Sequence, residues 1–163
     1  MMYSNSSLRW TDSLRRALLC AVVLFLLIGW TPAMQYVAAQ DAFITTWETS
    51  SANESITIPT NGRATVTDYD FEIDWGDGTV EQVTGDDPDP QHTYATAGTY
   101  TVSITGTFPH FFSDFGAGQL RTVEQWGSIQ WESMDSAFQG VNLDINATDV
   151  PDLTNVTSMR EMF

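Results

Sequence analysis

A mainly β protein built around a sandwich of six or seven strands is predicted by three features of this 163-residue sequence. First, residues 70–75 alternate strictly, with Phe71, Ile73 and Trp75 on one face of a strand and acidic residues on the other. Second, residues 99–104 alternate in the same way and form another half-buried strand. Third, short apolar segments recur with turn residues between them, a spacing that is typical of sandwiches.

The other expected strands are short and are separated by turn-forming residues. They span residues 42–47, 56–59, 64–67 and 79–83. Asn61-Gly62 is a hairpin-type turn signal before the third of these strands. Residues 86–90 hold three aspartates and two prolines, so they must form a loop. We place the end of the sandwich at Phe108-Pro109.

The stretch from Asp74 to Gly106 carries a distinctive pattern, DWGDGTVEQVTGDDPDPQHTYATAGTYTVSITG. A Gly-Asp-Gly-Thr turn at residues 76–79 is followed by His-Thr-Tyr at 92–94 and by Gly-Thr-Tyr-Thr-Val at 98–102. This pattern resembles the PKD domain, an immunoglobulin-like β-sandwich of extracellular proteins. The aromatic positions of that family's W-x-F-G-D-G turn are permuted here. The resemblance implies a domain over residues 41–109 that holds, spaces or binds other molecules and does not catalyse.

An internal repeat follows the expected sandwich. Residues 133–138 (SMDSAF) align with residues 158–163 (SMREMF) at a spacing of 25, and share the serine, the methionine and the closing phenylalanine. This period falls in the range of leucine-rich-repeat solenoids, whose units bury their apolar faces by stacking. Residues 110–132 are expected to be a connector and lead-in segment between the two parts.

The repeat also resembles a known family of surface proteins. Residues 153–163 (LTNVTSMREMF) are similar to the repeat phrase of the BspA-like leucine-rich repeat surface proteins of bacteria. Residues 125–131 (QWGSIQW) are similar to the segment that precedes the first repeat in that family. The resemblance implies that residues 133–163 begin a leucine-rich-repeat-like solenoid. We expect this array to be truncated, because the sequence has only two copies of the phrase.

Residues 1–40 have the pattern of a secretory signal peptide. Three arginines precede an uncharged apolar run over residues 17–30, and Val37-Ala38-Ala39 offers small residues for cleavage. An uncleaved N-terminal anchor is the alternative, because the run extended to Ala39 reaches the length of a membrane span. In either case we expect a secreted or cell-surface, extracellular protein.

The chain is strongly acidic, with 21 Asp and Glu against six Arg and no Lys, which gives a net charge of −15. This charge excludes nucleic acid as a partner, since phosphate contacts need cationic side chains, and leaves a membrane as partner only through residues 1–40. The single cysteine, Cys20, lies inside the apolar run, so no disulfide is expected in the rest of the chain. We interpret the acidity first as a solubility adaptation and second as binding of a divalent cation.

Two candidate sites each have a structural alternative. The aspartates around the glycine-rich turn and the following loop offer the oxygen ligands that calcium prefers. They are Asp74, Asp77, Asp86, Asp87 and Asp89. The alternative is that Asp77 caps its own turn. Trp126 and Trp131 are a candidate platform for stacking a sugar, and the alternative is that they cover the end of the solenoid where it meets the sandwich.

We expect a non-catalytic protein without a cofactor, calcium being the one alternative. The sequence has no Gly-x-Ser-x-Gly, no His-Glu-x-x-His and no phosphate-binding glycine loop. The leading function is adhesion or protein–protein interaction, with an unidentified extracellular protein or glycan as partner. In this hypothesis the sandwich is a spacer and the repeats are the contact surface. The alternatives are a carbohydrate-binding accessory module with a calcium-dependent acidic loop, and an enzyme that uses a pair of carboxylates.

Overall fold

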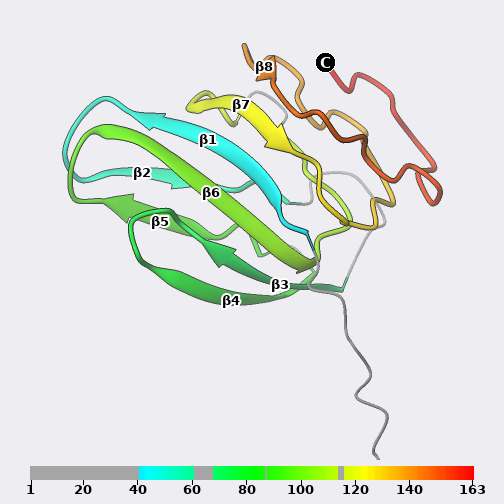
Figure 1. Ribbon diagram of the computed structural model, residues 1–163, viewed down its shortest axis with the longest axis horizontal. Coiled ribbons are helices and arrows are strands. Elements are labelled where there is room, and N and C mark those ends of the chain that lie inside the picture. Colours follow the sequence, from blue (N-terminus) through cyan, green and yellow to red (C-terminus); the bar gives the residue numbers. More distant parts are fainter. Residues whose placement is uncertain (1–40, 61–67, 87, 114–115) are drawn as a thin grey trace, which may run out of the picture. The chain divides into compact units, whose positions relative to one another are not determined.

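The structure, a computed structural model, describes residues 41–60, 68–86, 88–113 and 116–163. These residues form eight strands and no helix (Figure 1). The strands are β1 (Phe43–Thr49), β2 (Glu54–Thr57), β3 (Tyr69–Asp74), β4 (Val80–Gly85), β5 (Gln91–Tyr94), β6 (Gly98–Thr107), β7 (Leu120–Gln125) and β8 (Asp144–Ile145). The described residues therefore contain no helix long and apolar enough to cross a membrane. The expected signal peptide or anchor at residues 1–40, and the strand at 64–67 with its Asn61-Gly62 turn, lie outside the described residues.

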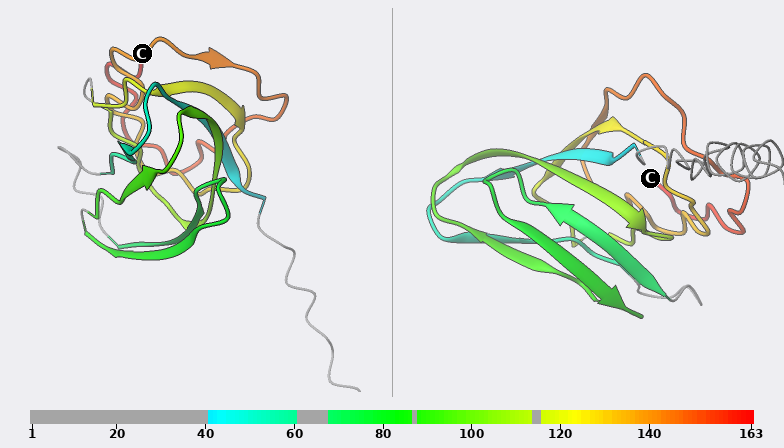
Figure 2. Two further views of the ribbon diagram at one scale, coloured as in Figure 1. Left: turned by 90° about the vertical axis from the view of Figure 1, so that its left-hand side faces the viewer. Right: turned by 60° about the horizontal axis from the view of Figure 1, so that its bottom comes forward.

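The strands form two separate sheets, which can be followed in Figures 1 and 2. Six strands form the larger sheet in the order β4-β3-β6-β1-β7-β8, and β2 pairs with β5 in the smaller one. Neighbouring strands are antiparallel except β7 and β8, which are parallel. The prediction of a mainly β fold is confirmed for the described residues.

The two alternating strands were predicted correctly because their side chains obey the two-residue period of a pleated strand. In β3, Phe71 and Ile73 are buried, as is Trp75 directly after it, while the acidic residues that alternate with them, Asp70, Glu72 and Asp74, are exposed. In β6, Val102 and Ile104 are buried on the same core side. Each strand thus presents one apolar face to the interior and one polar face to solvent.

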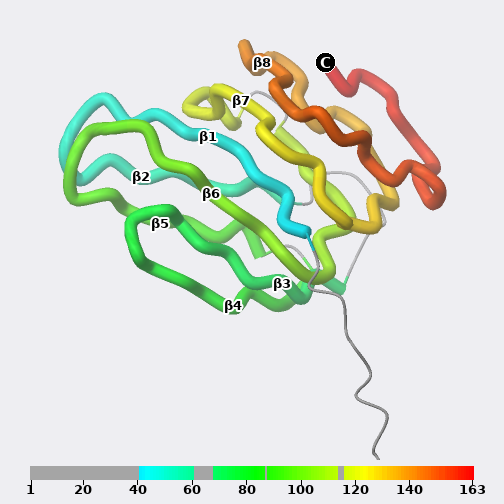
Figure 3. The backbone as a smooth tube through the Cα atoms, in the orientation of Figure 1, coloured from blue at the N-terminus to red at the C-terminus, as the bar shows by residue number. Residues whose placement is uncertain are grey.

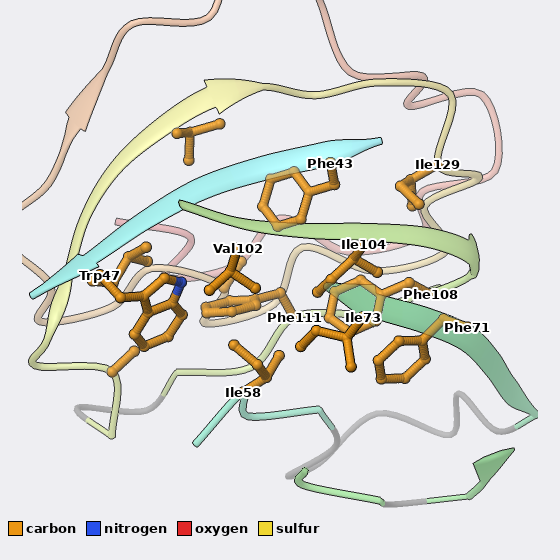
Figure 4. Packing of buried hydrophobic residues seen from close by; sticks show 14 of the residues in the cluster. Phe43, Trp47, Ile58, Phe71, Ile73, Val102, Ile104, Phe108, Phe111 and Ile129 are labelled. Atoms are coloured by element: carbon orange, nitrogen blue, oxygen red, sulfur yellow. The ribbon is translucent and has the colours of Figure 1, made fainter. Parts of the chain in front are cut away.

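One aromatic-rich core joins both sheets to the residues that follow β6 (Figure 4). Phe108 is fully buried and packs its ring edge-to-face against Phe71 and Trp131, with centroids 5.0 and 5.8 Å away. Phe43 of β1 lies 5.1 Å from Trp131 in a similar arrangement. The core therefore continues past Phe108-Pro109, where we expected the sandwich to end.

β7 extends the larger sheet from within residues 110–132, the expected connector. The far end of β7 is tied to the chain that leads into β1. The Gln125 Nε2 atom donates to the carbonyl oxygen of Ala42 at 3.0 Å, and the Ser128 amide donates to the carbonyl oxygen of Asp41 at 2.9 Å. The connector is thus an integral part of the sheet.

Three segments beyond β6 lie side by side, and we call them layer 1 (residues 109–113), layer 2 (residues 132–138) and layer 3 (residues 157–163). Figure 3 shows these turns of the chain, from yellow-green to red, stacked beside one another. Layer 2 joins layer 1 through the Glu132 amide, which donates to the carbonyl oxygen of Pro109 at 2.9 Å. An isolated parallel bridge supplements this bond.

Layers 2 and 3, which hold the two copies of the repeat, are joined by a ladder of backbone hydrogen bonds. Alternate amides of layer 2 donate to alternate carbonyl oxygens of layer 3. The donors are Met134, Ser136 and Phe138, and the acceptors are Ser158, Arg160 and Met162, at 2.8, 2.8 and 2.7 Å respectively. One bond runs the other way, from the Thr157 amide to the carbonyl oxygen of Glu132 at 3.0 Å.

A stack of three phenylalanine rings follows the same direction. Phe111 of layer 1 and Phe138 of layer 2 are stacked with centroids 5.3 Å apart, and Phe138 and Phe163 of layer 3 are stacked at 5.7 Å. Each layer contributes one ring, so ring stacking and backbone bonding set the same register.

Because Phe108 links β1, β3 and the Trp131 ring, Phe108→Ala should destabilise the sandwich and the layers together. Loss of a buried phenylalanine ring costs about 3–5 kcal/mol of unfolding free energy. We expect urea unfolding, followed by tryptophan fluorescence and by circular dichroism, to remain one coincident transition at a lower midpoint.

The matched control is Val80→Ala at an exposed position of β4, where Val80 is 54% exposed. Its effect should stay within about 0.5 kcal/mol. Two separate transitions in the unsubstituted chain would contradict a shared core.

Candidate functional site

The glycine-rich turn between β3 and β4 is closed by its own aspartates. The Gly76 amide donates to Asp74 Oδ1 at 2.9 Å, and the Thr79 amide donates to Asp77 Oδ1 at 3.0 Å. Gly76 has a φ of 78°, and a side chain there would collide with the carbonyl oxygen of Thr101 on β6. The turn therefore needs glycine at this position both for its conformation and for the close approach of β6.

The second oxygen of the Asp77 carboxylate binds a histidine on the smaller sheet. Asp77 Oδ2 lies 2.8 Å from His92 Nε2. The His92 ring stacks on Trp75 with centroids 5.0 Å apart and meets Tyr94 edge-on at 4.7 Å. The Tyr94 hydroxyl donates to the carbonyl oxygen of Trp75 at 2.8 Å, and burial raises the pKa of this tyrosine. This cluster fastens the turn of the larger sheet to β5.

Four of the five candidate calcium ligands are described, and they do not come together as a metal site. Asp74 and Asp77 accept amides of their own turn, whereas Asp89 Oδ1 accepts the amide and the hydroxyl of Thr60 at 2.8 and 3.0 Å. Asp87 lies outside the described residues. No three Asp, Glu, His or Cys side chains gather as a metal site among the residues that the structure describes.

The sugar-platform interpretation of Trp126 and Trp131 is contradicted, because their side chains are 5% and 0% exposed. The two rings meet edge-to-face with centroids 6.4 Å apart. The amides of Trp126 and Gly127 donate to the Asp149 carboxylate at 3.1 and 2.8 Å, which holds this corner closed. Both rings belong to the core, where neither face can meet a ligand.

A buried histidine in layer 1 is the titratable group that the sequence does not single out. His110 is fully buried, and its Nε2 atom lies 2.9 Å from the carbonyl oxygen of Asp135 in layer 2. Its Nδ1 atom has no hydrogen-bond partner within the described structure. Burial lowers the pKa of His110, against the opposing effect of the Asp135 carbonyl. The neutral ring is therefore the form that fits between the layers.

The outer face of the larger sheet has a shallow open hollow. It is lined by Asp70, Glu72, Gln82, Thr105 and Gly106. The Gln82 side-chain amide donates to Asp70 Oδ1 at 2.8 Å across this hollow. The lining is acidic and polar, as expected for the solvent face of β3.

The hydrogen bond with His92 is the leading cause that lowers the pKa of Asp77. The carboxylate form stabilises the fold above the ordinary pKa of 3.8, and its contribution is lost as the pH falls through the lowered value. In His92→Phe, which keeps a ring beside Trp75 but has no donor for the carboxylate, we expect the pKa of Asp77 to rise toward 3.8. Carboxyl-carbon NMR titration of both proteins measures the change, and an unaltered Asp77 titration would contradict the pairing.

His110 should make the fold acid-sensitive. Its pKa is lowered in the folded state, so the unfolded chain takes up the proton first as the pH falls below about 6.5. The free energy of unfolding should therefore decrease from about pH 6.5 toward the folded-state pKa. His110→Gln keeps a donor for the Asp135 carbonyl and should flatten this slope. An identical slope in both proteins, measured by urea unfolding between pH 5 and 7, would assign the acid sensitivity to other groups.

One family model describes this part of the chain: the PKD domain model matches residues 44–109. No curated protein and no solved structure matches the chain. The matched range begins in β1 and ends beside Phe108, so it includes the glycine-rich turn and the Asp77–His92 cluster. Domains of this family are typically extracellular modules of the adhesion or protein–protein interaction type. Over residues 44–109 the chain is therefore similar to the PKD domain, with that domain's mainly β, immunoglobulin-like fold.

Proposed function

We propose that the chain is a secreted or cell-surface protein of adhesion or protein–protein interaction, without catalytic activity. The PKD-like sandwich serves as a rigid spacer, and the layers that follow it begin a leucine-rich-repeat-like array that carries the contact surface. The partner is an extracellular protein, or a glycan on one.

The observation that carries this proposal is the combination of a firm base and an exposed apolar edge. Layers 1 and 2 share the core of the sandwich through Phe111 and Phe138, and Trp131 directly before layer 2 belongs to the same core. Farther out, large apolar side chains are exposed. They are Ile145, Val150, Leu153, Met159 and Phe163, at 45, 81, 37, 53 and 70%. We place the contact surface at these side chains, because contiguous exposed apolar patches are the surfaces that proteins use to bind one another.

The hydrogen-bonded stacking of layers 2 and 3 supports the solenoid part of the proposal. The two copies of the phrase, at positions 133–138 and 158–163, pair along the backbone in parallel. This arrangement is what repeat units need in order to bury their apolar faces against one another.

The alternative, a calcium-dependent carbohydrate module, needs two exposed tryptophan rings and a cluster of free carboxylates, and the described residues show neither. Trp126 and Trp131 are buried, and the described aspartates around the turn bind amides, hydroxyls and His92. We retain it as the second outcome of the test below.

The test is binding of the immobilised chain to panels of extracellular proteins and of glycans, in calcium and in chelator. Two matched variants each place a carboxylate on an equally exposed apolar position: Met159→Asp in layer 3 (53% exposed) and Val80→Asp in β4 (54% exposed). We expect protein binding that does not depend on calcium. The affinity should fall by roughly tenfold or more in Met159→Asp, because the new carboxylate would be buried against the partner and would cost about 1.4 kcal/mol or more of binding free energy. The affinity should be unchanged in Val80→Asp.

Equal binding by both variants would move the contact surface away from the layers. Glycan binding that requires calcium would replace the proposal with the accessory-module alternative. Turnover of a bound glycan would contradict the absence of catalysis.

A further inference from the structure

Three Asn-x-Ser/Thr tripeptides lie in the described part of the chain, at residues 53–55 (NES), 146–148 (NAT) and 155–157 (NVT). None of them has proline at the middle position, so each has the sequence of an acceptor for an N-linked glycan. In such a tripeptide the glycan is attached to the asparagine, and the transferring enzyme requires the hydroxyl of the third residue. The structure distinguishes the first tripeptide from the other two.

Asn53 lies in the turn that joins β1 to β2. Its side chain is exposed, and its backbone is left-handed, with a φ of 59°. Its amide donates to the carbonyl oxygen of Tyr94 on β5 at 2.9 Å. Figure 1 and the right-hand view of Figure 2 show this turn and layer 3 at opposite ends of the described strands. The surroundings of Asn53 therefore do not involve the layers.

The turn is closed by the residue after Asn53. The Glu54 Oε2 atom accepts the amides of Ser50 and Ser51 at 2.7 and 3.1 Å. The other oxygen, Oε1, accepts the side-chain amide of Gln119 at 3.2 Å. The hydrogen bond from the Ser50 amide is the leading cause that lowers the pKa of Glu54 to about 2. The turn is thus held at the surface by its neighbours.

The fold makes no use of the Asn53 carboxamide. In the described structure this side chain has no hydrogen-bond partner, and the backbone amide makes the bonds of the residue. A left-handed turn position accepts Gly, Asn or Asp, so the conformation alone does not require an amide side chain. A glycan on the Nδ2 atom would therefore extend into solvent without displacing a contact.

The other two tripeptides lie beside packed segments. The Asn146 side-chain amide already donates to Glu124 Oε1 at 2.8 Å. Asn155 is exposed, but it lies two residues before Thr157, whose amide and hydroxyl both donate to the carbonyl oxygen of Glu132. A glycan at Asn155 would thus stand next to the bonds that hold layer 3 on layer 2. Asn53 is the position that the fold leaves open.

We propose that Asn53 is a site of N-linked glycosylation, with a lipid-linked oligosaccharide phosphate as the donor substrate. The Asn53 Nδ2 atom bonds to the anomeric carbon of the first sugar. The bond between that carbon and the phosphate oxygen of the lipid carrier breaks, and the amide proton is lost as the lipid phosphate leaves. The glycan covers the end of the sandwich that is far from layer 3, so it leaves the proposed contact surface free.

This inference rests on the proposed secretion of the chain, because the transfer takes place across the membrane that a secreted chain passes. The test is secretion of the full chain from a host that has an oligosaccharyltransferase, followed by mass spectrometry of its peptides. Enzymatic release of the glycan in heavy-oxygen water marks each glycosylated asparagine as a labelled aspartate. We expect this label at Asn53.

Substitutions in the tripeptide separate recognition from the acceptor itself. Asn53→Asp keeps a residue suited to a left-handed turn and should abolish the modification. Ser55→Ala leaves the acceptor amide in place and should also abolish it, whereas Ser55→Thr should retain it. The matched control is Ser51→Ala, which removes a hydroxyl of the same turn that lies outside the tripeptide, 3.3 Å from Glu54 Oε2. The glycan should be unchanged in this control.

Four outcomes decide between this inference and the proposed function. A secreted chain with an unmodified Asn53, or with a glycan at Asn146 or Asn155 alone, would overturn the inference and leave the proposed function standing. A modification that persists in Ser55→Ala would also overturn it. Retention of the chain in the cytosol would overturn both, because the acceptor would never meet the transferase. A glycan at Asn53 together with protein binding that Met159→Asp does not weaken would overturn the proposed contact surface alone.

Discussion

The structure depends on one interaction above all, the edge-to-face packing of Phe108 and Phe43 against Trp131. These rings come from β1, from the end of β6 and from the segment after β7, and each is fully buried. Their contact extends the core of a small sandwich, whose second sheet has two strands, so that the segments after β7 can pack against it. In the described part of the chain, which contains no cysteine, such packing takes the place that disulfides hold in many small extracellular domains.

A second constraint is the match between two kinds of periodic structure. The sandwich is built from antiparallel pairs, whereas the layers pair in parallel at the interval of the repeated phrase. β7 reconciles them, because it is antiparallel to β1 on one side and parallel to β8 on the other. A strand that pairs in antiparallel on one side and in parallel on the other can join an antiparallel sandwich to parallel repeat units within one sheet.

The sequence revealed those features that depend on neighbouring residues. The alternation in β3 and β6 and the Gly76 turn are local, so they were predicted correctly. The burial of Trp126 and Trp131 was one of two alternatives. Spacing alone could not decide between them, because burial requires β7 to pair with β1, the first strand of the sandwich. The same holds for the aspartates, whose partners Thr60 and His92 come from distant segments. Layer 1 was not predicted either, because residues 109–113 (PHFFS) do not match the repeated phrase.

The bonds that join the end of β7 to the start of β1 have a mechanical consequence. β1 begins and β7 ends at the same end of their antiparallel pair, so tension between residue 41 and the layers would pull the two strands apart from that end. Antiparallel strands loaded in this direction peel open one bond at a time. That end is where Gln125 and Ser128 donate to the carbonyl oxygens of Ala42 and Asp41, with Asp149 holding the next turn. A tether under flow or traction would thus be reinforced at the point where failure would start.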